Sequence, residues 1–210
     1  MQNNRNSWLT ISGAAGILTP IIAFTCIILA IISYPAFSWT NNALSDLGVQ
    51  SGATASLFNY GLIVSGLCAL AFAVGLFIYL GERTLGKTGT SLFILATIAL
   101  ISIGMFPENA EPMHYYASVT FFFLVPVAML VIVATCFQLN KPKLAGYTLF
   151  AALIAAAPWI LQFTVSYVPN VAIPETISAI SASAWSVVVG LIMIRNRSSK
   201  TEATIAVKAS

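Results

Sequence analysis

Six long apolar stretches divide this chain and constrain its fold more than any other feature. They run approximately over residues 8–32, 57–80, 90–105, 114–137, 147–166 and 177–194, and each is bounded by Gly, Pro, Asn or charged residues. A helix of about 20 apolar residues is long enough to cross the hydrocarbon core of a bilayer. We therefore predict an all-α, polytopic integral membrane protein, with a six-helix transmembrane domain over residues 1–194.

The composition agrees with one membrane domain and excludes a soluble globular protein. Of the 210 residues, 59% are hydrophobic and only 7% are charged, against about 25% charged in ordinary soluble domains. A short basic tail over residues 195–210 is expected to be cytoplasmic and disordered. The first stretch is about twice as long as the apolar region of a secretory signal peptide, so we expect a retained helix. Its cleavage would leave five helices.

The basic residues predict the orientation. With six spans, all nine Lys and Arg residues fall before the first helix, in the connectors 81–89 and 138–146, or in the tail. These segments share one side, and Lys and Arg accumulate on the cytoplasmic side of membrane proteins. We therefore predict a cell-membrane protein with both termini cytoplasmic and with loops 33–56, 106–113 and 167–176 extracytoplasmic. These loops carry four of the six acidic residues, and the one histidine, His114, directly follows the second of them.

Several functions are excluded by residues that the chain lacks. One histidine cannot supply two axial haem ligands or three zinc ligands, and no lysine lies in a span to form a retinal-type Schiff base. Cys26, Cys68 and Cys136 lie within apolar stretches and lack metal-site spacing. No phosphate loop or hydrolase motif is present. We predict no cofactor and no nucleic-acid partner, and a divalent cation such as Ca²⁺ or Mg²⁺ stays an open possibility.

Two outer connectors contain the candidate site. The segment from Ser38 to Gly48 is polar, and its pattern predicts a short interfacial helix that stops at Gly48. In the second connector, Pro112 suits the first position of the fourth helix, which places Glu111 at the cap and His114 in the first turn. The N–H groups there disfavour a charged imidazole. The structural alternative is a capped turn for the first connector. For the second connector it is a capping Glu beside an interfacial His.

The first functional hypothesis is an outward-facing site at the membrane surface that binds a lipid headgroup or a cation. Its proposed ligand-binding residues are Asp46, Glu108, Glu111 and His114. In an extended form, the site modifies a membrane lipid, with His114 as general base or ligand, Asp46 as its orienting or metal-binding partner, and Ser45 as nucleophile or donor. Whether the protein is an enzyme is left open.

Two alternatives come from other classes of protein. Stripes of small residues at intervals of four suggest an accessory or scaffold subunit. Such stripes allow close helix contact, either inside the bundle or with a homo-oligomer or membrane-complex partner. One stripe is Ser178, Ala182, Ser186 and Gly190, and the other is Ser65, Ala69 and Ala73. A small transporter or channel is suggested by a fifth helix broken at Pro158 and carrying Gln162. Against transport, the predicted midplane has no charged residue.

Short motifs in the outer connectors resemble a known family. The matching residues are Ser45-Asp46-Leu47-Gly48, then Phe58 and Gly61, then Phe106 and Pro107 and, after a short gap, His114. With them, the chain resembles the family called domain of unknown function 998, a group of small polytopic membrane proteins. The resemblance implies a six-helix bundle and site positions, and it supplies no activity. More distantly, the Ser-Asp-Leu-Gly loop and outer His look like the Frag/DRAM/Sfk family, some of whose members are associated with lipid and lipid-anchor remodelling.

Overall fold

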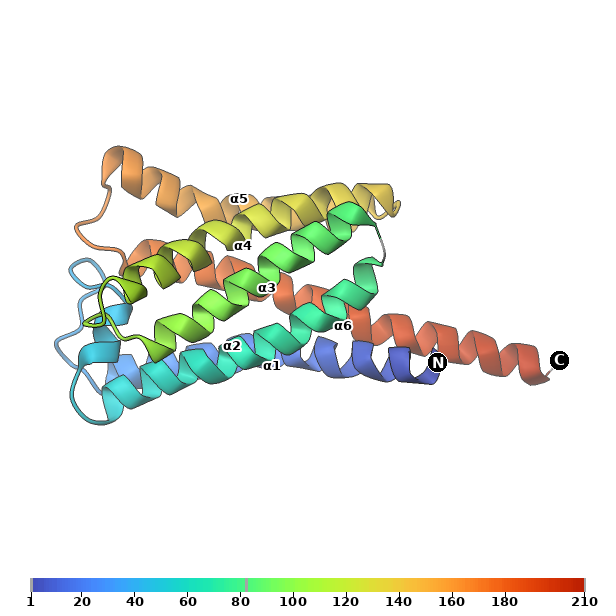
Figure 1. The fold of residues 1–210 in the computed structure, drawn as a ribbon, viewed down its shortest axis with the longest axis horizontal. Helices are drawn as coiled ribbons and strands as arrows, with labels where there is room; N and C mark the ends of the chain where they lie inside the picture. The colour runs from blue at the N-terminus through green and yellow to red at the C-terminus, as the bar shows by residue number, and fades with distance from the viewer. Residues whose placement is uncertain (1, 82, 210) are drawn as a thin grey trace.

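The chain folds into a helical bundle in a computed structural model, which describes the backbone of residues 2–81 and 83–209 and the side chains of residues 5–81 and 83–195. The elements are α1 (Gln2–Ile32), the 3-10 helix η1 (Ser45–Val49), α2 (Ala53–Leu80), α3 (Thr84–Met105), α4 (Met113–Gln138), α5 (Pro142–Val165) and α6 (Ala172–Ala209). All six α-helices are long and apolar enough to cross a membrane (Figure 1). This confirms the predicted all-α architecture with six candidate spans.

The helices extend beyond the apolar stretches that revealed them. The third stretch was expected at residues 90–105, whereas α3 begins at Thr84. Hydropathy marks only the part of a helix suited to hydrocarbon, while backbone hydrogen bonds continue the helix through Thr, Lys and Gly. The break expected in the fifth helix is absent, because α5 continues through Pro158. The prediction of a broken fifth helix was therefore wrong, and the transporter or channel alternative loses that support.

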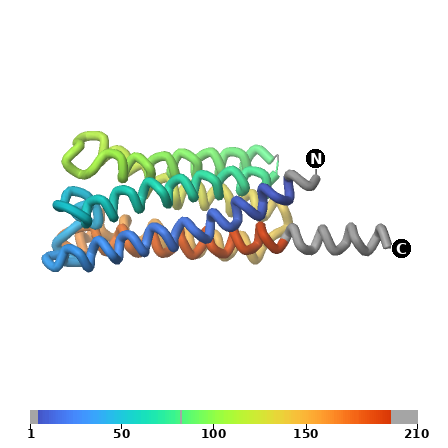
Figure 2. The backbone as a smooth tube through the Cα atoms, turned by 90° about the horizontal axis from the view of Figure 1, so that it is seen from below, coloured from blue at the N-terminus to red at the C-terminus, as the bar shows by residue number. Residues whose placement is uncertain are grey.

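The helices are arranged as a closed ring. Each helix packs against the next one in the chain, and α6 packs back against α1. In Figure 2, α1 crosses the bundle obliquely in contact with both α2 and α6. Short connectors favour antiparallel neighbours of this kind, and closure of the ring surrounds a common interior.

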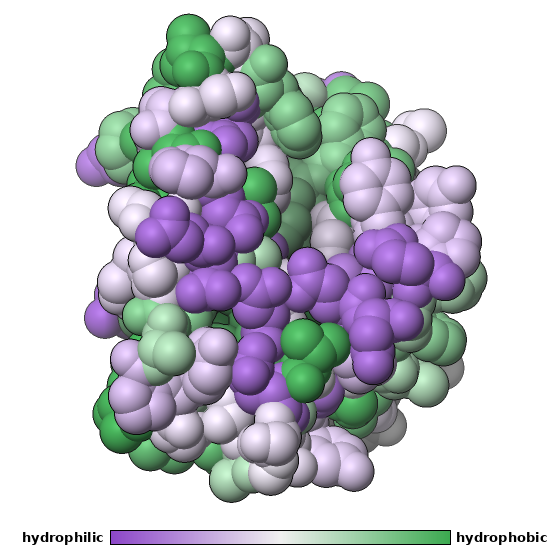
Figure 3. All heavy atoms as spheres, turned by 90° about the vertical axis from the view of Figure 1, so that its left-hand side faces the viewer, coloured by the Kyte–Doolittle hydropathy of each residue, from purple (hydrophilic) through white to green (hydrophobic). Residues whose placement is uncertain are grey.

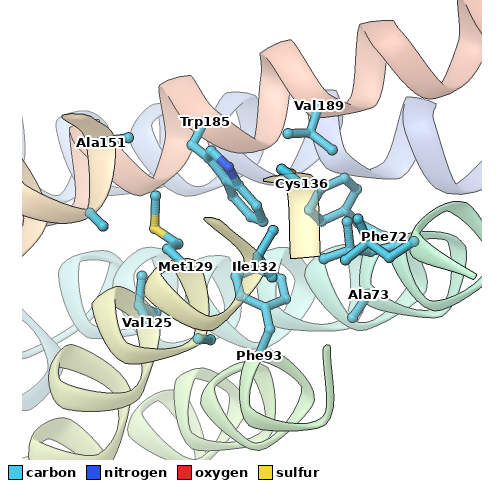
Figure 4. Close-up of a cluster of buried hydrophobic side chains, with 14 of the residues drawn as sticks. Phe72, Ala73, Phe93, Val125, Met129, Ile132, Cys136, Ala151, Trp185 and Val189 are labelled. Atoms are coloured by element: carbon cyan, nitrogen blue, oxygen red, sulfur yellow. The ribbon is translucent and has the colours of Figure 1, made fainter. Parts of the chain in front are cut away.

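Aromatic side chains fill part of this interior. Phe72, Phe93 and Trp185 meet edge to face, with ring centroids between 5.4 and 5.9 Å apart (Figure 4). The Trp185 Nε1 donates a hydrogen bond of 3.1 Å to the Thr148 hydroxyl, which satisfies the indole N–H away from water. This cluster joins α2, α3, α5 and α6.

The stripes of small residues on α2 and α6 lie within the bundle. A Cβ on Gly190 would come within 2.5 Å of the Gly13 carbonyl oxygen, so α1 and α6 make direct backbone contact. The Ser186 hydroxyl donates to the Gly16 carbonyl at 3.0 Å, and the Ser178 hydroxyl donates to the Ala155 carbonyl at 2.6 Å. Small residues on α6 therefore serve contacts with α1 and α5.

The two ends of the bundle differ in charge. At one end, here called the acidic end, connectors 33–52, 106–112 and 166–171 gather; they contain no Lys or Arg. The opposite, basic end holds the other connectors and both described ends of the chain (Figure 1). There, Lys141 donates to the Tyr79 hydroxyl at 2.6 Å. The side chains beyond Arg195 lie outside the described residues, so the expectation of a disordered tail over 195–210 stays a prediction.

Candidate functional site

The first connector folds onto the start of α6. The backbone N–H of Ala172 donates to the Asn42 carbonyl at 3.0 Å, and that of Asn170 donates to the Thr40 carbonyl at 3.0 Å. The Leu44 N–H donates to Glu175 Oε2 at 2.6 Å. These bonds hold a buried glutamate of α6 beneath the connector, between segments that are distant in sequence.

The short helix expected in this connector is present as the 3-10 helix η1, but it does not stop at Gly48. That glycine lies inside η1, where a Cβ would come within 2.6 Å of Asn59 Oδ1. The Asn59 amide also donates to the Gly48 carbonyl at 2.9 Å. Gly48 is therefore required for close approach to α2, and its terminating role was wrongly predicted.

The Asp46 carboxylate organises its own loop. Its Oδ2 accepts hydrogen bonds from the Asn42 side-chain amide at 2.6 Å and from the Ala43 N–H at 3.1 Å. The Gln50 amide donates to the Asp46 carbonyl at 2.8 Å. These bonds fix the carboxylate on the side of η1 that faces the second connector.

The second connector enters α4 one residue later than expected. Helix α4 begins at Met113, so Pro112 holds the cap position and Glu111 precedes it. The carbonyl of Ala110 accepts hydrogen bonds from the N–H groups of Met113 and His114, at 3.1 and 3.2 Å. Because this turn already satisfies those donors, Glu111 is not needed as a cap, and its side chain is exposed.

His114 is buried, with 5% of its surface exposed. Its Nδ1 lies 2.7 Å from the Phe106 carbonyl oxygen, and since a carbonyl only accepts, Nδ1 carries the proton. Its Nε2 lies 3.3 Å from the Ser118 hydroxyl, one turn along α4. Within the part of the chain that the structure describes, no hydrogen bond joins His114 to Asp46 or Ser45.

Acidic side chains from three segments converge at the acidic end. Asp46 and Glu108 lie close enough to each other, and to Glu175, for their charges to interact. The pKa of Glu108 is raised to about 7. Desolvation is the main cause, and the hydrogen bond and charge of Asp46 and the charge of Glu111 contribute the rest. No group of three or more His, Cys, Asp or Glu residues among those described is arranged to hold a metal ion.

A groove of about 590 Å³ opens between α4 and α5 at this end. Figure 1 shows the two helices diverging toward the acidic end, and Figure 3 shows a band of hydrophilic residues across that end, hollowed beside the band. The polar residues of the groove are Ser45, Glu108, Glu111, His114, Ser118, Asn170 and Glu175. Three of the four proposed ligand-binding residues therefore line one groove, and Asp46 does not line it.

The rest of the groove is apolar and open to the side of the bundle. Trp159 lies between Phe122 and Phe163, with ring centroids 4.7 and 6.0 Å away. Phe163 is 80% exposed and Phe123 is 63% exposed, which places aromatic surface along the opening. The groove thus has a polar upper part and an apolar lower part.

A smaller central cavity of about 110 Å³ lies inside the ring. Phe72 and Phe93 form part of its wall. Ser45, Ser118 and Glu175 border both the cavity and the groove. Glu175 therefore stands between the lateral groove and the interior of the bundle.

Two residues of this site were absent from the predicted set. Glu175 lies three residues before Ser178, so it extends the small-residue stripe of α6 and shares its inward face. Ser118 lies four residues after His114 on the same face of α4. Helical spacing from Ser178 and from His114 could therefore have predicted that Glu175 and Ser118 belong to the candidate site.

Six membrane-length helices and a polar groove at one end define a class, the multi-pass helical membrane proteins. Within it, the chain belongs to the family described as Protein of unknown function (DUF998), whose profile matches residues 17–192. This confirms the resemblance, and the match does not address the more distant Frag/DRAM/Sfk likeness. No curated protein matches the chain, and no solved structure matches it.

The motif residues behind the resemblance have visible structural roles. Gly48 and Phe58 pack together where η1 meets α2, and a Cβ on Gly61 would come within 2.4 Å of the Cys26 Cβ. The Phe106 carbonyl orients His114. These residues therefore build the frame that positions the acidic end.

Proposed function

We propose that this protein binds an amphiphilic lipid in the groove between α4 and α5. The headgroup lies among Glu108, Glu111, His114 and Glu175, and the chain lies along the aromatic wall below them. The observation that carries this proposal is the pairing of a polar upper end with an apolar, laterally open lower part in one groove. Ligand sites commonly combine mostly apolar walls with a few polar groups.

The dimensions of the groove suit a lipid chain. From His114 to Leu130, both of which line it, α4 advances about 24 Å at about 1.5 Å per residue. The groove volume falls within the range of about 300–1,000 Å³ typical of small-molecule sites. An entrance along the side of a helical bundle gives a lipid direct access from the bilayer.

The acidic end is proposed to face the outside of the cell membrane, which puts the headgroup site in the outer leaflet. The support is the concentration of Lys and Arg at the opposite end. Both termini are then cytoplasmic.

We propose binding rather than chemistry as the activity of the groove. A nucleophile and its base need to lie within hydrogen-bonding distance, but no hydrogen bond among the described residues joins His114 to Ser45 or Asp46. The His114 ring lies between the Phe106 carbonyl and the Ser118 hydroxyl, and Asp46 is bonded within its own loop. The predicted roles of Ser45, Asp46 and His114 in lipid modification therefore lack a catalytic contact that would support them.

Two neighbouring alanines on α5 provide a matched test. Ala156 lines the groove, whereas Ala157 is exposed and does not line it. We expect Ala156→Trp to fill the groove and Ala157→Trp to leave it open. Each protein is purified from the same membranes in a mild detergent, and the retained lipids are counted and identified by native mass spectrometry.

The expected result is one retained lipid class in the wild type and in Ala157→Trp, and its loss from Ala156→Trp. Thermal unfolding in detergent verifies that both variants are folded. Equal lipid retention by folded Ala156→Trp and Ala157→Trp would show that the groove is not a lipid site.

A further inference from the structure

We propose that the headgroup held in this groove is positively charged, an ammonium group carried on an apolar chain. This inference rests on the proposed function, because it specifies the chemistry of the ligand in the same groove. It stands on the kinds of polar atoms that the groove offers and on one buried carboxyl side chain.

Most polar side chains of the groove present hydrogen-bond acceptors, and the Trp159 Nε1, which has no partner among the described residues, is a donor. Glu108, Glu111 and Glu175 contribute carboxyl groups, and the Nδ1–H of His114 is already used by the Phe106 carbonyl. One N–H of the Asn170 side-chain amide donates to the Asn41 carbonyl at 3.0 Å. A ligand that supplies donors and positive charge complements such a surface.

Glu175 supplies evidence independent of the number of acidic residues. Its side chain is 7% exposed and borders the groove. Leu44 donates to Oε2, and Oε1 accepts no hydrogen bond from any residue that the structure describes. An unpaired charge on a buried carboxyl group is unfavourable, so a cation in the groove would stabilise the ionised form of Glu175. We therefore place the cationic group of the ligand beside Glu175.

The protein itself supplies little positive charge at this end. The connectors of the acidic end contain no Lys or Arg. The N-termini of α4 and α6 contribute about half a positive charge each, which offsets about one of the four carboxyl groups. An anionic headgroup such as phosphate would oppose ionisation of these carboxyl groups, whereas a cationic headgroup would favour it. An ammonium group would also meet the exposed ring of Tyr115 at the rim of the groove, where aromatic faces attract cations.

The test compares amphiphiles that share one chain and differ in charge. Purified full-length protein in dodecyl maltoside is titrated with radiolabelled tetradecylamine, and unlabelled tetradecylamine, tetradecanol and tetradecyl phosphate compete for it at fixed detergent concentration. The same titration is made with Glu175→Gln, Ala156→Trp and Ala157→Trp. We expect saturable binding at one site per chain, competition by the amine at least about tenfold stronger than by the alcohol or the phosphate, and at least about tenfold weaker binding to Glu175→Gln.

The outcomes separate this inference from the proposed function. If tetradecanol or tetradecyl phosphate competes as well as the amine, and Ala156→Trp still blocks binding, the lipid groove stands and the cationic headgroup is wrong. Unchanged amine affinity in folded Glu175→Gln also overturns the inference. If no probe binds in a manner sensitive to Ala156→Trp, both fail together. Thermal unfolding of each variant distinguishes lost binding from lost folding.

Discussion

Glu108 and Glu175 lie at the same end of the bundle but differ in burial and in hydrogen bonding. Glu175 enters from the first turn of α6 and receives the Leu44 N–H. Glu108 comes from the second connector, where desolvation, followed by Asp46 and Glu111, raises its pKa to about 7. Both side chains border the groove, so a ligand would meet carboxyl groups that differ in burial and in their hydrogen bonds.

The raised pKa of Glu108 predicts a pH dependence of stability. An unfolded chain releases this proton near pH 4.5, whereas the folded protein holds it until about pH 7. Between these values the folded state binds more protons, so the free energy of unfolding falls as the pH rises through this window. We expect a higher thermal midpoint at pH 5 than at pH 8 in detergent, with a smaller difference in Glu108→Gln.

The groups that face Glu108 are Asp46 on η1, Glu111 in the same connector and, across the groove, Glu175 on α6 and His114 on α4. Exposed Glu111 provides the matched control, since Glu111→Gln removes a neighbouring charge but leaves the half-buried carboxyl group of Glu108 in place. Its effect on the pH dependence is expected to be the smaller one. A pH profile that Glu108→Gln leaves unaltered would assign the dependence to another group.

At the scale of elements, close contact between α1 and α6 closes the ring. Gly13 and Gly190 bring the two backbones together, and Ser186 adds a hydrogen bond to Gly16. Such contacts matter in a membrane, where van der Waals packing and interhelical hydrogen bonds drive helix association.

This contact can be tested with single methyl groups. In Gly190→Ala, the new Cβ would meet the Gly13 carbonyl oxygen at 2.5 Å, and relieving that clash is expected to cost about 1–3 kcal/mol. Gly146→Ala on α5 is the control, because nothing lies within 4 Å of its Cβ position. That change is expected to be neutral or to stabilise the helix by up to about 1 kcal/mol. Unfolding in mixed micelles measures both; equal stability of the two variants would show that the α1–α6 contact tolerates separation.

For the whole molecule, the main asymmetry is between the two ends. One end gathers three polar connectors and the mouth of the groove, and the other gathers the basic residues and both described ends of the chain. In a membrane this asymmetry predicts a single orientation, with the acidic end outside.

Thiol labelling in intact cells checks that orientation. The background replaces Cys26, Cys68 and Cys136 with Ala, and exposed positions then receive one cysteine each: Asn109→Cys at the acidic end, and Lys87→Cys near the basic end. We expect a membrane-impermeant maleimide to label Asn109→Cys in intact cells and Lys87→Cys only after permeabilisation. The reverse pattern would place the groove in the inner leaflet.

Hydropathy and charge along the chain determined the six helices, the all-α class and the division of the molecule into an acidic and a basic end. These properties follow from local sequence, because an apolar run of membrane length has few alternatives to a helix. Acidic residues, the histidine and the family motifs also marked the outer connectors, which the structure gathers at the acidic end; their role as a ligand site stays a prediction. Exact helix starts, such as Met113 rather than Pro112 for α4, depended on turn hydrogen bonds that the sequence pattern does not reveal.

The tertiary structure decided which of these side chains meet. Leu44 and Glu175 lie 131 residues apart and share a hydrogen bond, His114 is held by Phe106 rather than by Asp46, and Asp46 is drawn back into its own loop. The groove exists because α4 and α5 diverge toward the acidic end. Contacts of this kind depend on the relative placement of whole helices and on long-range hydrogen bonds between connectors, and neither hydropathy nor spacing along one segment contains that information.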